Sequence, residues 1–368
     1  MTDRHLLYIA GGGTGGHLMP ALAMAEFSRK SWPELDIEFI GVERGLEADI
    51  LPKRKESVFL LKMHGISGAG LWQKLRVLAW ELPYSTYRIM KHWQPRRPDL
   101  VVGVGGYASV AAALAAALQR IPLVLYEQNA IAGMSNRHLV RFCKKIMLGF
   151  SEADKLLPKN KCIHTGNLVS RSISGLHWQP HDPPQLLVLG GSQGASFFNS
   201  QLPRACRLLT EQGVRFTVAH IAGDQPAGIE AIRSAYQDAG IKAKVMGFHH
   251  QMPDFYASGD LLIARGGAMT VSEAAAAGLP CIFIPLPNAA DFHQHRNADA
   301  LVQAGAATML EQSEATPAQL ANMIKNYLAR PEVLKQMSRA AKQAVPDDAW
   351  KQQSAVLSQW LGTTAVSA

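Results

Sequence analysis

The sequence predicts an α/β protein with two doubly wound domains, each a parallel sheet covered by helices on both faces. Short apolar and β-branched runs alternate with helical stretches along the chain, as successive βαβ units do. Each half also opens with a strand, a glycine-rich loop and a helix. We therefore expect two domains that face each other across a cleft, with ligands at the carboxyl ends of the strands.

Eleven segments have the composition of buried strands. They are 6–10, 37–41, 58–60, 100–104, 123–126 and 145–148 in the front half, and 186–189, 216–221, 244–246, 261–264 and 281–284 in the back half. The proline-rich run 179–184 breaks the pattern before the back half begins, which is typical of a domain linker. We place the domains at 1–167 and 168–344, with a C-terminal helix in 345–368 that packs back on the first domain.

Composition excludes several classes of protein. With 368 residues, 48% hydrophobic and 18% charged, the chain can bury two cores and is not disordered. Its longest apolar run, 110–118, is far shorter than the 18 or so residues of a membrane span. The four scattered cysteines form no C-x-x-C pair, so we expect free thiols in a reducing compartment. These features predict a soluble cytoplasmic protein.

The positive charge lies in the front half. The net charge is +8, and the first 165 residues hold 22 basic and 14 acidic side chains, whereas the remainder hold 15 of each. Segment 53–97 alone has ten basic residues against Glu56 and Glu81. Such asymmetry indicates that this half faces an anionic surface. Nucleic acid is disfavoured because no known binding motif appears.

Segment 71–82 suggests which surface this is. One helical stripe, expected to face the core, consists of Leu71, Leu75, Leu78 and Leu82. Other apolar residues fall outside the stripe, among basic ones: Trp72, Val77 and Trp80. That mixture is typical of an interfacial membrane patch. The alternative is a helix that is buried on most sides and has solvated lysines.

The first glycine loop, 11–16, leads into His17. Glycines let backbone N–H groups approach an anion or a sugar at a helix N-terminus. No Gly-Lys-[Ser/Thr] follows, so the loop is not a Walker loop, although it can be aligned with a dinucleotide fingerprint with Glu43 as the ribose acid. A histidine there is a candidate general base, because the unperturbed pKa of histidine, about 6.5, suits proton transfer near neutral pH. The alternatives are that His17 caps the helix and that the loop is only a structural turn.

Further glycine loops and polar residues follow other strands. Loop 190–195 places Ser192 where a phosphate could bind, and loop 265–267 precedes Glu273, a carboxylate suited to ribose hydroxyls. Polar residues 127–129 end another strand and indicate a polar ligand. Together these loops predict a bound nucleotide derivative. His293 and His295 could be mistaken for metal ligands. No third ligand occurs at a spacing typical of metal sites, so we expect no metal site.

At these motifs the sequence resembles the MurG family of peptidoglycan glycosyltransferases, in the family's order and spacing over nearly the whole chain. The motifs are Gly12-Gly13-Thr14-Gly15-Gly16-His17, Gly105-Gly106-Tyr107, Glu127-Gln128-Asn129, Gly190-Gly191-Ser192-Gln193-Gly194-Ala195 and Ala268-Met269-Thr270-Val271-Ser272-Glu273. The resemblance implies the GT-B fold of two Rossmann-like domains, the first facing acceptor and membrane and the second binding the UDP-sugar.

It also implies inverting transfer of N-acetylglucosamine from UDP-N-acetylglucosamine to the 4-hydroxyl of the N-acetylmuramoyl-pentapeptide of lipid I, which yields lipid II. The enzyme would lie peripherally on the cytoplasmic face of the bacterial inner membrane, against anionic lipid. No cofactor and no metal are expected, because helix N-termini at 190–195 and near Ala268 can meet the charge of the leaving UDP.

The resemblance assigns roles residue by residue. The catalytic candidates are His17, as base, and Glu127, and the acceptor-binding residues are Thr14, His17, Tyr107 and Glu127. The donor-binding residues are Thr14, Gly15, Gly16, Asn129, Ser192, His249, Ala268, Met269, Thr270, Val271, Ser272, Glu273 and Gln294. The chain departs from the family in two places: an expected arginine is displaced to Arg171, and His293 precedes Gln294 where some members have paired glutamines.

Three other functions compete with this one. A soluble UDP-sugar enzyme, such as a UDP-N-acetylglucosamine 2-epimerase, would share the donor pocket but has no use for a membrane patch. A nicotinamide-dependent oxidoreductase would use the first glycine loop and leave Ser192 and Glu273 unexplained. A non-catalytic membrane adaptor would explain the patch but not His17.

Overall fold

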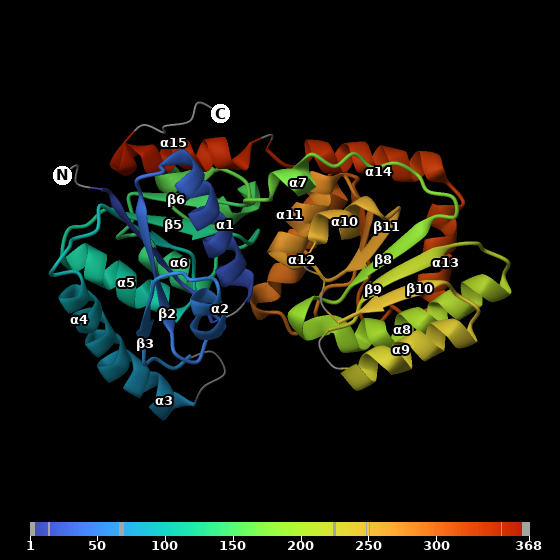
Figure 1. Cartoon of the computed structure of the whole chain (residues 1–368), viewed down its shortest axis with the longest axis horizontal. Coiled ribbons are helices and arrows are strands. Elements are labelled where there is room, and N and C mark those ends of the chain that lie inside the picture. The colour runs from blue at the N-terminus through green and yellow to red at the C-terminus, as the bar shows by residue number, and fades with distance from the viewer. Residues whose placement is uncertain are drawn as a thin grey trace. The chain divides into compact units, whose positions relative to one another are not determined.

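A computed structural model describes residues 4–13, 15–65, 70–223, 226–247, 249, 251–346 and 348–362, without the side chains of 192–195, 226, 227 and 290 (Figure 1). The chain divides into two compact units. Unit 1 runs to Leu168 and includes the segment after Pro346, and unit 2 is Val169–Pro346. The boundaries predicted from the sequence, after residues 167 and 344, lie close to these divisions.

The proline-rich run 179–184 is not the boundary, because it lies inside unit 2. Hydrogen bonds from the run itself and from the residue before it join this segment to unit 2. The Trp178 indole N–H donates to the Asp260 carbonyl at 3.1 Å, and the His181 amide donates to the Asp260 carboxylate at 2.8 Å. The segment before the first strand of unit 2 is therefore part of the unit rather than a free linker.

Unit 1 contains a seven-stranded parallel sheet in the order β3-β2-β1-β4-β5-β6-β7. Its strands are β1 (Leu6–Ala10), β2 (Asp36–Val42), β3 (Val58–Leu61), β4 (Leu100–Gly103), β5 (Leu123–Glu127), β6 (Lys145–Leu148) and β7 (Cys162–His164). All six strands expected in this half are confirmed. The edge strand β7 was not predicted, because three partly exposed residues carry no clear pattern.

Helices cover both faces of this sheet. They are α1 (Gly15–Ser31), α2 (Glu47–Lys53), α3 (Leu71–Arg76), the π-helical turn η1 (Val77–Glu81), α4 (Leu82–His92), α5 (Tyr107–Leu118), α6 (Met134–Leu139), the 3₁₀ turns η2 (Ser151–Leu156) and η3 (Lys159–Lys161), and α15 (Ala349–Leu361). Along β1, Leu6 and Tyr8 pack in one core with α4 and α5, whereas Leu7 and Ile9 pack in a second core with α1 and α15. The two-residue alternation of a strand thus supplies both cores.

Unit 2 contains a six-stranded parallel sheet in the order β10-β9-β8-β11-β12-β13. Its strands are β8 (Gln185–Leu189), β9 (Thr217–Ile221), β10 (Ala243–Met246), β11 (Leu261–Ala264), β12 (Cys281–Phe283) and β13 (Ala307–Met309). Its helices are α7 (Arg171–Ser174), α8 (Gly191–Glu211), α9 (Pro226–Asp238), α10 (Met252–Ala257), α11 (Ala268–Ala277), the 3₁₀ turn η4 (Ala290–Phe292), α12 (His293–Gln303), α13 (Pro317–Leu328) and α14 (Pro331–Gln343). The two doubly wound parallel-sheet domains expected from the sequence are confirmed.

The expected core stripe of segment 71–82 is wrong for three of its four leucines, because only Leu82 packs against the core. Leu71, Leu75 and Leu78 are exposed, with Leu71 at 71%. The buried positions of α3, η1 and α4 are instead Val77, Glu81, Ser85, Thr86 and Ile89. Glu81 can be buried because Arg76 and His64 pair with it. A polar residue thus occupies the inner face, while the first three leucines of the stripe face outward. Among the described helices, none is long and apolar enough to cross a membrane.

The four cysteines are all free, as expected. Helix α15 closes unit 1 by packing on α1. The Trp350 indole N–H donates to Ser31 Oγ at 2.8 Å, and its ring stacks on Phe27 with centroids 5.3 Å apart. The Gln353 side chain donates to the Gly166 carbonyl at 3.0 Å, beside the end of the unit's main segment. The C-terminal helix is thus part of the second core.

Replacing Trp350 with alanine is expected to lower the free energy of unfolding by about 3–5 kcal/mol, because it opens a cavity between α15 and α1. Urea denaturation monitored by circular dichroism measures this loss. Trp72→Ala is the matched control, since Trp72 is 84% exposed and its loss should change stability by no more than about 0.5 kcal/mol. Equal stabilities of the two variants would contradict the packing role of α15.

Candidate active site

The first glycine loop is held by the carboxylate of Glu47. This side chain is fully buried, and its oxygens accept the Gly13 amide at 2.7 Å and the Val42 amide at 2.8 Å. A Cβ added to Gly12 would lie 2.3 Å from the Glu47 carboxyl carbon, and the φ angle of Gly12 is +144°. Only glycine fits at this position, because any side chain would collide with the Glu47 carboxylate and because the backbone has a positive φ angle. Glu47 is not among the residues predicted from the sequence.

The predicted base, His17, lies in the first turn of α1, after Gly15 and Gly16. Thr14 lies outside the described residues. The His17 ring packs on Gly105, where an added Cβ would be 2.7 Å from its Cδ2 atom. A Cβ on Gly106 would likewise be 2.6 Å from the Gly12 carbonyl oxygen. The two glycine loops that follow β1 and β4 are therefore in direct contact, and His17 lies between them.

Tyr107, a predicted acceptor residue, begins α5 beside the connection that follows β3. A Cβ on Gly65 would be 3.1 Å from the Tyr107 ring. This connection is fixed by Glu81, which accepts the His64 amide at 2.9 Å and the Arg76 side chain at 2.9 Å. Burial raises the pKa of Glu81, but the hydrogen bonds from His64 and Arg76 lower it more, so the net pKa is below its usual value.

Glu127 ends β5 with both oxygens engaged. They accept the amides of Asn129 at 3.0 Å and Gly133 at 2.8 Å, and the side chain of Asn136 at 2.9 Å. The Asn129 side chain also donates to Glu127, at 3.2 Å. These bonds fix the loop after β5 and indicate a structural role for this buried carboxylate. The roles predicted for Glu127 in catalysis and acceptor binding and for Asn129 in donor binding stay predictions.

In unit 2, the predicted donor residues lie at the carboxyl end of β11. Ala268, Met269 and Thr270 form the partly buried first turn of α11, and Val271 and Ser272 are buried behind them. Glu273 follows, and its Oε2 atom accepts the Tyr256 hydroxyl at 2.8 Å. Burial raises the pKa of Glu273 to about 7, although the Tyr256 hydrogen bond acts in the opposite direction.

Gln294 lies beside the same loop. A Cβ on Gly266 would be 2.2 Å from the Gln294 carbonyl oxygen, and the Gln294 side chain accepts the Leu286 amide at 2.9 Å. The buried Arg265, to which the sequence predicted no role, donates to the Ile284 carbonyl at 2.9 Å. Its guanidinium also lies over the Phe198 ring, 4.8 Å from the centroid. The structure thus brings residues 268–273 and Gln294 together.

The remaining predicted residues lie elsewhere in unit 2. Ser192 falls in the first turn of α8, and its side chain lies outside the described part of the chain. The His249 ring lies 6.2 Å from the Phe255 ring, centroid to centroid. His295 contacts Glu311 at 3.0 Å. Within the described residues, no group of three His, Cys, Asp or Glu side chains is placed to bind a metal ion.

Comparison with known proteins identifies the family. Residues 7–148 match the glycosyltransferase family 28 N-terminal domain, and residues 185–353 match the C-terminal domain of the same family. Proteins named UDP-N-acetylglucosamine--N-acetylmuramyl-(pentapeptide) pyrophosphoryl-undecaprenol N-acetylglucosamine transferase are close in sequence. The one from Anaeromyxobacter sp. is 39% identical over 91% of this chain and 88% of its own length. The one from Geobacter sulfurreducens is 37% identical over 93% and 95%.

Solved structures agree. The crystal structure of Acinetobacter baumannii MurG has a TM-score of 0.79 and 29% identity, and covers 96% of this chain and 99% of that one. A UDP-N-acetylglucosamine 2-epimerase has a TM-score of 0.67 but only 14% identity over 98% of this chain and 97% of that one, a likeness that shows the fold alone. The expected GT-B fold and glycosyltransferase class are confirmed. The chain belongs to glycosyltransferase family 28 and, within it, to the MurG family of N-acetylglucosamine transferases that its motifs resemble.

Proposed function

We propose that this chain transfers N-acetylglucosamine from UDP-N-acetylglucosamine to the 4-hydroxyl of the N-acetylmuramoyl-pentapeptide of lipid I, which yields lipid II. The observation that carries the proposal is the sequence match to transferases whose name gives both substrates, over 91–93% of the chain. The epimerase alternative has weaker support, because the likeness to epimerases extends to the fold alone.

The mechanism needs one in-line displacement at the anomeric carbon, which inverts its configuration. His17 takes the proton of the acceptor hydroxyl as general base, since it lies at the junction of two glycine loops in unit 1. In unit 2, α8 and α11 begin directly after β8 and β11, so their N-terminal N–H groups are suited to the charge of the leaving UDP. Glu273 accepts the ribose hydroxyls, and Gln294 contacts the sugar.

No divalent ion is required in this mechanism, because the backbone N–H groups at the starts of α8 and α11 stabilise the negative charge of the leaving UDP. UDP release from UDP-N-acetylglucosamine, measured in chelator with and without a lipid I analogue, tests both the transfer reaction and its independence from a divalent ion. We expect release that depends on the analogue and is accompanied by a disaccharide product. Release without acceptor would favour an epimerase or hydrolase, and activity that returns only when magnesium is added would refute the metal-free mechanism.

We also propose that unit 1 binds the cytoplasmic face of the bacterial inner membrane peripherally. The exposed apolar face of α3 and η1 supports this, since Trp72 is 84% and Trp80 73% exposed. Leu71, Leu75 and Leu78 are exposed on the same segment, and Lys74 lies among them. Apolar bulk next to basic side chains suits the interface of an anionic bilayer, where each Lys or Arg contributes about 1 kcal/mol.

Replacing His17 with alanine is expected to lower kcat about 10²–10⁴-fold, the usual contribution of a positioned base, with donor affinity nearly unchanged. Steady-state transfer kinetics and a donor titration measure the two effects separately. A kcat like that of the unaltered protein would place the base elsewhere, with Glu127 the next candidate.

Affinity for UDP-N-acetylglucosamine is expected to rise about tenfold between pH 6 and pH 8, with a midpoint near 7. The carboxyl of Glu273 has its pKa raised to about 7, so it loses its proton over this range and becomes the stronger acceptor for ribose hydroxyls. Titrations across this range measure the change. The titrant is the UDP-sugar and not UDP, because UDP has a terminal phosphate that itself titrates near neutral pH and the UDP-sugar has none. Glu273→Gln should bind weakly at all pH values; an unchanged pH profile in that variant would exclude Glu273.

The double substitution Trp72→Ala/Trp80→Ala is expected to reduce flotation with anionic vesicles several-fold and to leave the free energy of unfolding nearly unchanged, because both indoles are exposed. Added salt should weaken the remaining binding, since the basic residues act through screened charge. Vesicle binding insensitive to both the substitutions and salt would reject this membrane surface.

A further inference from the structure

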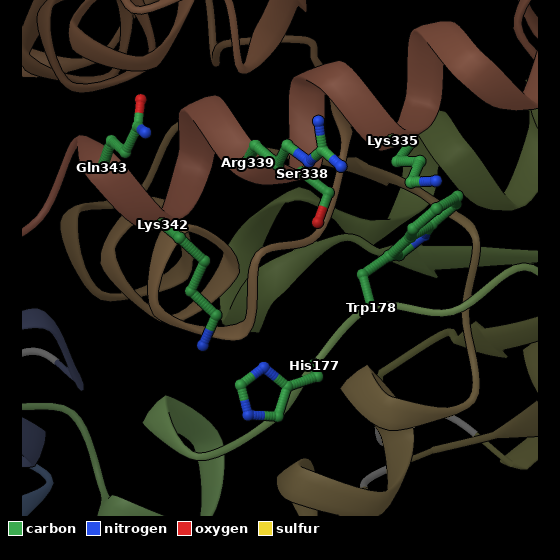
Figure 2. Close-up of a pocket in the computed structure, with 7 residues that line it drawn as sticks. All are labelled: His177, Trp178, Lys335, Ser338, Arg339, Lys342 and Gln343. Atoms are coloured by element: carbon green, nitrogen blue, oxygen red, sulfur yellow. The ribbon is translucent and has the colours of Figure 1, made fainter.

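Unit 2 contains a cavity between α14 and the segment that precedes β8. Its volume is about 360 Å³, near the lower end of the roughly 300–1,000 Å³ typical of small-molecule sites. Figure 2 shows Lys335, Ser338, Arg339 and Lys342 along α14, with Trp178 on the facing segment. Among the described residues that line the cavity, none is acidic.

The cavity lies away from the predicted donor site. Trp178 is anchored through its indole N–H to Asp260, which directly precedes β11, whereas residues 268–273 follow the other end of that strand. The C-terminal end of α11 returns toward the cavity, where the Lys342 ammonium donates to the Ala276 carbonyl. The two regions therefore occupy opposite ends of β11.

The charge of the cavity is uncompensated. Lys335 and Arg339 are exposed, and neither forms a hydrogen bond or ion pair with any residue that the structure describes. Because they are four residues apart on one helix, their charges repel each other. Lys342 adds a third positive charge on the same side, and burial lowers its pKa, which an anion nearby would offset.

We propose that this cavity is a second ligand site, which binds a small soluble molecule bearing a phosphate group. Lys335 and Arg339 hold the phosphate, because a free guanidinium and ammonium are the usual partners of its oxygens. The Ser338 hydroxyl adds a donor at the cavity wall, and the half-buried Trp178 ring offers an apolar surface to the body of the ligand. The proposal does not depend on the transfer reaction.

Calorimetric titration of the full chain with glycerol 3-phosphate, in saturating UDP to fill the donor site, tests the proposal. We expect one site per chain, weakened about tenfold or more in Lys335→Gln/Arg339→Gln, which loses charge-assisted hydrogen bonds. The control Arg204→Gln/Arg207→Gln removes the same charge from exposed positions of α8 and should change the Kd by less than about twofold.

Absence of binding would overturn the proposal. Equal weakening in the two double variants would also overturn it, because it would show that overall positive charge, and not this cavity, attracts the ligand. A second arm uses phosphatidylglycerol vesicles, whose headgroup presents the same phosphate. If Lys335→Gln/Arg339→Gln loses vesicle binding but keeps its affinity for glycerol 3-phosphate, the site is a lipid contact and not a soluble-ligand site. Unchanged thermal unfolding and an unchanged KM for UDP-N-acetylglucosamine show that the variant is folded.

Discussion

Buried carboxylates that accept backbone N–H groups fix the loops from which the site is built. Glu47 accepts two amides around the first glycine loop, and Glu127 accepts two in the loop after β5. Away from the site, at the opposite end of β11, Asp260 fixes unit 2 in the same way by accepting the amides of His181 and Gln185 before β8. A buried carboxylate without such partners is costly, so each loop conformation and its carboxylate are stable only together.

This constraint explains why the loops are rich in glycine and why the His17 ring can pack directly on the backbone of Gly105. The Glu47 carboxylate occupies the space that a side chain at Gly12 would need, and the His17 ring occupies the corresponding space at Gly105. Loops that follow parallel strands are otherwise free to vary, and here contacts on both sides restrict them. The role as base that we propose for His17 depends on such restriction, because a displacement of about 1 Å can cost a hundredfold in rate.

Much of the fold could be predicted from the sequence, because strands buried on both faces are continuous apolar runs and the glycine loops mark their ends. Features that depend on contacts between residues distant in the sequence could not be predicted in this way. Three of the four leucines in 71–82 face outward, and Glu81 takes an inner position that depends on His64 from a separate segment. The role of Glu47 likewise rests on Gly13, 34 residues away. A charged residue is expected on the protein surface unless the hydrogen-bond or ion-pair partners that allow its burial are known.

The positioning role of the buried carboxylates is tested most directly by kcat/KM for glycosyl transfer by Glu47→Gln. The glutamine keeps the size of the side chain but replaces one accepting oxygen with a donor, so either the Gly13 or the Val42 amide loses its partner. We expect kcat/KM to fall about tenfold to a hundredfold as the loop before His17 shifts, although Glu47 itself is fully buried. An unchanged kcat/KM would show that the buried carboxylate does not position the site.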